Sequence, residues 1–132
     1  MISIKKYNPK MKKLWDDFVD QSNTGTIFQK QSFLNYHLKR KFQDYSLLFY
    51  NKNVLVSVLP AALIKNKNYT IFYSHPGSSF GGFVFHYNVT FKLIQEIISA
   101  LEKYLIRVKI HYITLILAPS AYYDKNDESL NY

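Results

Sequence analysis

The sequence predicts an α/β protein with a mixed sheet, of the α+β kind, in the order strand, helix, helix, three strands, helix, strand. Three observations lead to this expectation. Apolar residues recur at helical spacing in residues 11–19 and 94–105. Elsewhere they alternate or run continuously over short segments, as strands do. Asn- and Lys-rich turns join the middle segments, which indicates antiparallel hairpins.

The N-terminal part predicts a strand and then a helix. "ISIKK" at residues 2–6 alternates, and Asn8 and Pro9 are suited to cap and open a helix. The apolar stripe of this helix consists of Met11, Leu14, Trp15, Phe18 and Val19. We expect its three aspartates to form a solvated face: Asp16, Asp17 and Asp20.

A second, shorter helix is predicted near residues 31–41, with Phe33, Leu34, His37 and Leu38 on one face. We expect His37 to be hydrogen-bonded at the edge of the core rather than to serve as a ligand. Three strands follow, at residues 45–50, 54–63 and 69–74. Since Pro60 has no N–H, the middle strand is expected to bulge there or to face no neighbour.

The C-terminal part predicts a long helix and a last strand. Thr90 is expected to cap the helix, whose stripe consists of Ile94, Ile97, Ile98, Leu101, Tyr104 and Leu105. "YITLIL" at residues 112–117 is apolar at nearly every position, which is typical of a strand buried on both faces.

Composition excludes several classes of protein. The chain has 132 residues, enough for one modest core, and no cysteine, so disulfides and thiol chemistry are excluded. It contains no apolar run of signal-peptide or membrane-spanning length, so a cytoplasmic, non-transmembrane protein is expected. The net charge of +8 comes almost entirely from lysine, whereas base recognition favours arginine, so specific nucleic-acid binding is not expected.

The stretch "SHPGSSFGGFVF" at residues 74–85 holds three of the four glycines. "GSSFG" fits the pattern of a nucleophilic serine, but the apolar "FVF" after it predicts a strand where a nucleophile elbow needs a helix. A phosphate loop is disfavoured because Gly82 lies eight residues before Thr90 and so does not open the helix. Two interpretations remain: a tight turn between strands, or the wall of a substrate groove, where missing Cβ atoms let a ligand approach the backbone.

The candidate groove residues are those of this loop and its approach: Tyr73, His75, Ser79, Phe80, Gly81 and Gly82. Metal binding is not expected, because the four histidines have no ligand-type spacing. An acid–histidine pair is not expected either, because Glu96 and Glu102 fall on the solvent face of the long helix.

The element order resembles the first part of the GNAT acyltransferase fold, and several local patterns resemble its FemAB-related branch. These patterns are "WDDFV" at 15–19, "GTIF" at 25–28, "DYSLLFY" at 44–50, "VLPA" at 58–61, "HPGSSFGG" at 75–82 and the tail after Ala118. The resemblance implies an acyl- or aminoacyl-transferase that acts on an amine of a cell-surface sugar or peptidoglycan precursor.

The chain departs from the GNAT pattern at one point. GNAT enzymes usually hold the acyl-CoA pyrophosphate on a glycine-containing loop that opens the third helix, and "FHYNVTFK" stands there without glycine. We therefore expect residues 1–118 to be an incomplete, N-terminal GNAT-like lobe, inactive alone, and residues 119–132 to lead toward a remainder. The lobe itself would bind no cofactor. The full-length protein would use acyl-CoA or aminoacyl-tRNA as donor.

The expected partners are a C-terminal lobe or partner chain, a second copy of the chain, and an anionic sugar or peptide precursor attracted by the lysines. Two alternatives remain open. One is a noncatalytic basic module that binds RNA or another polyanion through Lys39, Arg40, Lys41, Lys65 and Lys67. The other is a structural lobe that needs a partner chain.

Overall fold

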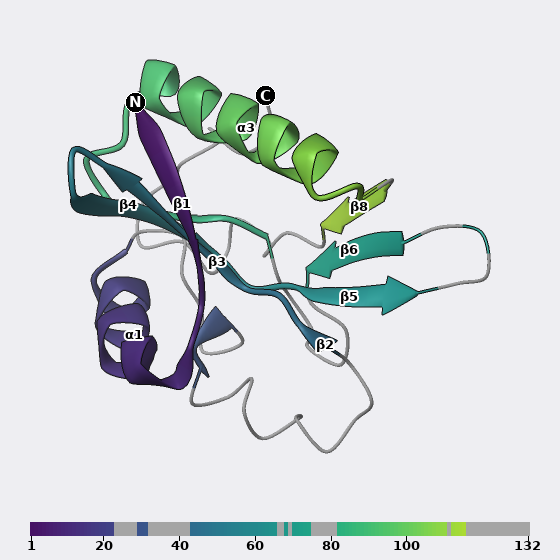
Figure 1. Ribbon diagram of the computed structural model, residues 1–132. Helices are drawn as coiled ribbons and strands as arrows, with labels where there is room; N and C mark the ends of the chain where they lie inside the picture. The colour runs from purple at the N-terminus through teal and green to yellow at the C-terminus, as the bar shows by residue number, and fades with distance from the viewer. Residues whose placement is uncertain are drawn as a thin grey trace.

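The computed structural model describes residues 1–22, 29–31, 43–65, 68, 70–74, 82–110 and 112–115; residues 114 and 115 are described by their backbone alone. Two four-stranded sheets share the centre of the molecule, with one long helix above them and one shorter helix below (Figure 1). This mixed α/β architecture confirms the predicted fold class.

The first sheet has the strand order β1-β3-β4-β7 and is antiparallel throughout. Its strands are β1 (Ile2–Lys6), β3 (Leu47–Asn51), β4 (Val54–Leu59) and β7 (Val84–Phe85). The second sheet has the order β2-β5-β6-β8, and only β6 and β8 are parallel to each other. Its strands are β2 (Gln43–Asp44), β5 (Ala62–Lys65), β6 (Thr70–Ser74) and β8 (Tyr112–Leu115).

The expected strand over residues 54–63 is wrong in its extent, because Pro60 divides it between the two sheets as β4 and β5. The pairing register with β2 and β3 is unchanged across the division, so one long hairpin bends from sheet to sheet. Pro60 has no N–H to donate at the bend. The Ser46 carbonyl accepts a hydrogen bond from the Tyr7 amide at 2.8 Å, which continues the β1–β3 pairing by one residue. The hairpin's own turn places Lys52 and Asn53 at φ 51° and 68°, as a two-residue turn requires.

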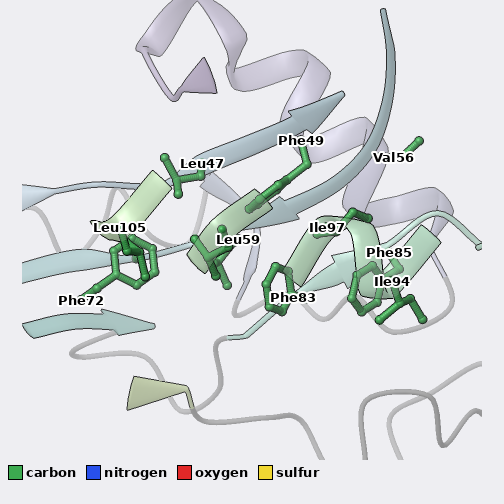
Figure 2. Close-up of a cluster of buried hydrophobic side chains, with 12 residues drawn as sticks. Leu47, Phe49, Val56, Leu59, Phe72, Phe83, Phe85, Ile94, Ile97 and Leu105 are labelled. Carbon is green, nitrogen blue, oxygen red and sulfur yellow. The ribbon is translucent and has the colours of Figure 1, made fainter. Parts of the chain in front are cut away.

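The main core lies between the sheets and α3 (Phe91–Arg107). Figure 2 shows its side chains, among them Phe49, Phe72 and Phe83 from strands and loops and Ile97 from the helix. The Thr90 hydroxyl accepts from the Leu93 amide at 3.1 Å, which confirms the predicted cap. Ile98 departs from the predicted buried stripe, since 39% of its surface is exposed.

A smaller core lies on the opposite face of the first sheet, under α1 (Lys12–Gln21). Trp15 and Val19 pack there against Leu48, Val58 and Val84. A short 3₁₀ helix, η1 (Pro9–Met11), precedes α1, and the Asn8 side chain caps it by accepting from the Lys10 amide at 2.9 Å. The expectation of caps at this end is therefore confirmed.

Two expectations about burial are wrong. Asp16 is not solvated: it is 8% exposed, and its carboxylate accepts a hydrogen bond from the Gln31 amide at 2.6 Å, because the chain after α1 folds back over this position. Asp17 and Asp20 are exposed and pair with Lys13 and Lys30. The last strand is not buried on both faces either, since Tyr112 and Ile113 are 57% and 43% exposed. In the described part of the chain β8 pairs only with β6, at the edge of its sheet.

Candidate substrate site

The glycine loop leaves the sheet where the two sheets part. β6 pairs with β5 and β7 pairs with β4. The strands before and after the loop therefore lie along the same side of the continuous β4–β5 segment. Ala62 pairs with Tyr73 and Ser57 pairs with Phe85. Between these two pairs the β4–β5 segment advances five residues, whereas the chain from β6 to β7 advances twelve. The surplus corresponds to residues 75–81, which lie outside the described residues. The loop is thus an excursion from an otherwise continuous path, and a two- to five-residue hairpin turn is excluded.

Ser74 closes the neck of this excursion. Its buried hydroxyl accepts a hydrogen bond from the Gly82 amide at 2.7 Å and donates one to the Pro60 carbonyl. One side chain therefore joins both ends of the loop to the bend in the neighbouring hairpin. The paired ends fix where the loop begins and ends, whatever conformation its middle takes.

Gly82 is needed at the neck for its backbone conformation. Its φ is 81°, in the left-handed region that residues with a Cβ adopt at a cost. The residue is buried, and its carbonyl accepts from the Gln29 side-chain amide at 3.4 Å. The loop neck is in this way connected to the segment after α1.

That segment forms a buried polar connection. The Trp15 indole donates to the Gln29 carbonyl at 2.8 Å, and the Gln31 amide donates to Asp16. The side-chain nitrogen of Gln31 and the hydroxyl of Tyr7 are buried without a hydrogen-bond partner in the part of the chain that the structure describes. Burial raises the pKa of Tyr7, and the carboxylates of Asp16 and Asp44 raise it further, so this hydroxyl stays protonated.

A row of residues crosses the second sheet on the face opposite α3. Asp44 pairs in register with Ala62, and Ala62 pairs in register with Tyr73, so the three lie side by side on one face. Their neighbours along the strands, Tyr45 and Phe72, face α3. The row therefore places a carboxylate and a phenol two strands apart, with only a methyl group between them.

Asp44 is held in position by Ser46. The Ser46 hydroxyl donates to the Asp44 carboxylate at 2.9 Å and accepts from the Ala61 amide at 3.2 Å. Both Asp44 and Tyr73 are partly exposed. This end of the row is also where the parallel strands β6 and β8 end, at Ser74 and Leu115. Ligands of open α/β sheets bind at the carboxyl ends of parallel strands, where neighbouring connections diverge.

The start of α3 differs from a glycine-rich phosphate cradle. The amides of Asn88 and Val89 donate to His86 and that of Leu93 to Thr90, so three N–H groups are already occupied. The chain has no glycine after Gly82, and Tyr87 and Asn88 form the turn that precedes the helix. A pyrophosphate would need free, converging N–H groups here.

Of the predicted groove residues, the structure places Tyr73 and Gly82. Tyr73 lies at the end of β6 and Gly82 at the loop neck. His75, Ser79, Phe80 and Gly81 lie outside the described residues, as do His37 and the basic residues of the alternative polyanion site except Lys65, which is exposed. β7 after the glycines confirms that a strand stands where a nucleophile elbow would require a helix. Glu96 and Glu102 are exposed, as expected.

Sequence reasoning missed Asp44, Ser46 and Ser74. Asp44 and Ser46 fell in or beside an ordinary strand pattern, and only the register across two hairpins brings them to the loop neck. Over the described ranges no cluster of three histidine or acidic residues suits a metal ion. Within those ranges no helix has the length and apolarity that crossing a bilayer requires.

Solved structures resemble this arrangement over nearly its whole length. A GNAT family acetyltransferase from Staphylococcus aureus has a TM-score of 0.58 and 17% identity, over 96% of this chain and 93% of that one. The fold is that of the GNAT acetyltransferases.

Other structures with the GNAT fold agree. A possible acetyltransferase from Clostridium difficile has a TM-score of 0.56 and 9% identity, over 100% of this chain and 90% of that one. The aminoglycoside N-acetyltransferase AAC(6')-Iy, in complex with CoA, has a TM-score of 0.53 and 11% identity, over 91% and 79%. No family model matches the sequence. No curated protein matches it either.

Proposed function

We propose that this chain carries the acceptor side of an N-acyltransferase, which transfers an acyl or aminoacyl group to an amine. The observation that carries the proposal is the position of Asp44 and Tyr73. They flank Ala62 on one face, at the carboxyl ends of β6 and β8, beside the closed neck of the glycine loop. The GNAT fold of the chain and the acetyltransferase names of its structural neighbours support this chemistry.

In the proposed reaction the amine nitrogen attacks the carbonyl carbon of a thioester or ester. A C–N bond forms, the C–S or C–O bond breaks, and the leaving group takes up a proton. Asp44 holds the acceptor ammonium and accepts its proton as the amine attacks. Ser46 orients the Asp44 carboxylate. The Tyr73 ring forms one wall of the groove, and its hydroxyl positions the acceptor. His75, Ser79, Phe80 and Gly81 would complete this wall.

The charge of the chain bears on the acceptor. The net charge of +8 repels a polycationic amine such as an aminoglycoside and attracts an amine that also carries an acidic group. We therefore propose an amino sugar or peptide precursor with an anionic group, as in the FemAB-related branch. The occupied amides at the start of α3 support a donor held elsewhere than on this helix, by a second lobe or through the tRNA of an aminoacyl donor.

The test is group transfer by the full-length protein, with acetyl-CoA and aminoacyl-tRNA as donors and anionic and neutral amines as acceptors. Asp44→Asn should lower kcat/KM about 100-fold and Tyr73→Phe about tenfold, within the range for a base and a positioning group. Tyr50→Phe, on the first sheet, is the matched control. The chain spans 93% of the Staphylococcus aureus structure, so it should also be assayed alone. Transfer that both site variants leave unchanged would overturn the site, and no transfer from either donor would overturn the function.

Donor binding is a separate measurement. Calorimetry of the chain with acetyl-CoA should give no saturable site in the micromolar range, because the helix start offers no glycine and its Leu93 amide is occupied by Thr90. A one-site micromolar dissociation constant would contradict this expectation. Sequence-selective, sub-micromolar RNA binding that is lost on Arg40→Ala would favour the polyanion-binding alternative instead.

A further inference from the structure

The outer face of α3 carries a second apolar row. Phe91, Ile98 and Ile106 are 56%, 39% and 76% exposed, although a surface helix normally directs polar residues outward. At about 100° per residue these three fall within a sector of roughly 80°, which they share with Gln95 and Glu102. The buried stripe of the helix lies on the neighbouring sector and already packs on the sheets.

This apolar row matches the same row on a second copy of α3 that runs in the opposite direction. Phe91 lies seven residues before Ile98, and Ile106 lies eight residues after it, so a two-fold axis near Ile98 would bring Phe91 of one copy against Ile106 of the other. The same operation puts Glu102 opposite Gln95, one turn from Lys92 of the other copy. We propose that this face pairs antiparallel with α3 of a second copy of the chain.

The charges of the face agree with this pairing. Neither Lys92 nor Glu102 takes part in an ion pair within the described residues, so both are available across the axis. The two-fold axis would form the Lys92–Glu102 contact twice. A parallel pairing would instead put Lys92 beside Lys92 and Glu102 beside Glu102. Charge thus selects the antiparallel arrangement.

The pairing should be weak. One helix face buries less than the roughly 800 Å² per partner that stable interfaces use, and two chains of +8 repel each other. A reversible dimer is expected at tens of micromolar chain, measured near physiological ionic strength, where the Debye length is about 8 Å.

Cysteine cross-linking tests the geometry directly, because the chain has no cysteine of its own. Ile98→Cys, near the axis, should form disulfide-linked dimers with itself. An equimolar mixture of Phe91→Cys and Ile106→Cys should form mixed dimers faster than either variant alone. Val54→Cys, 60% exposed on the β3–β4 hairpin, gives the collision background. Disulfide yields for the α3 variants that are no higher than that of Val54→Cys would overturn the proposal. Preferential self-linkage of Phe91→Cys would overturn the antiparallel arrangement.

Sedimentation equilibrium tests the energetics. Ile98→Lys should raise the dimer dissociation constant at least tenfold, and Val54→Lys should not. Glu102→Lys should weaken the dimer, and adding Lys92→Glu should restore it to within threefold of wild type. A wild-type chain that stays monomeric at about 200 μM would refute the pairing. So would a dimer that Leu115→Lys dissociates and Ile98→Lys does not, which would assign the contact to β8.

Discussion

Ser74→Ala should be one of the most destabilising single-atom deletions in this chain. The hydroxyl satisfies the buried Gly82 amide and donates to the Pro60 carbonyl, so alanine leaves a donor and an acceptor without this partner. An unsatisfied buried amide costs about 1–3 kcal/mol, and a carbonyl that has lost one donor costs less. We expect the free energy of unfolding to fall by about 2–4 kcal/mol.

The matched control is Ser57→Ala. Ser57 is also fully buried, but within the described residues its hydroxyl makes a single hydrogen bond, to the Val84 carbonyl at 2.9 Å. Its loss should cost about 1 kcal/mol, the net value of an ordinary hydrogen bond. Urea denaturation at 25 °C, with the slope m compared among the variants, measures both. If Ser74→Ala costs no more than Ser57→Ala at equal m, the neck does not depend on Ser74.

Three further predictions follow from backbone and side-chain geometry. Gly82→Ala should lower the free energy of unfolding by about 1–2 kcal/mol, because φ is 81° there; an unchanged denaturation midpoint would contradict this. Lys109→Gly should raise it by about 0.5–1 kcal/mol, because Lys109 occupies the left-handed position (φ 62°) after α3, where glycine is usual; Lys103→Gly, inside α3, is the opposite-sign control. Burial and the 2.9 Å hydrogen bond to the Tyr45 hydroxyl raise the pKa of Tyr104 to about 12, so the native state holds this proton longer than the unfolded chain. Stability should therefore fall as pH rises from about 10 to 12, and Tyr45→Phe should reduce this slope in denaturation series across that range.

If the glycine loop is the wall of a groove, Gly81→Val should close the groove and leave the fold largely intact. Gly81 lies outside the described residues, so this stays a prediction. The position that the structure shows to need a left-handed conformation is its neighbour, Gly82. The pattern of glycines indicated such a need in this stretch. It could not say which glycine, because that depends on how the returning chain meets Ser74.

The sequence by itself determined the local features of this protein. Asn8 and Thr90 as caps, the buried stripe of α3 and the turn at Lys52 and Asn53 all follow from residues within about one helical turn of each other. Such features need no knowledge of the partner segment. The α/β class followed from the order of these local elements, and the fold confirms it.

Tertiary structure alone decided the rest. The bend at Pro60, the length of the glycine excursion and the row formed by Asp44 and Tyr73 depend on the register between strands, whose paired residues here lie 11 or more positions apart in the sequence. Burial is decided in the same way: Asp16 is covered by the distant Gln31, while Ile113 is exposed because the described chain puts no strand beyond β8. Hydrophobic periodicity records which face of an element is apolar. It does not record which other element covers that face, because the contact energy depends on both partners and on the path of the chain between them.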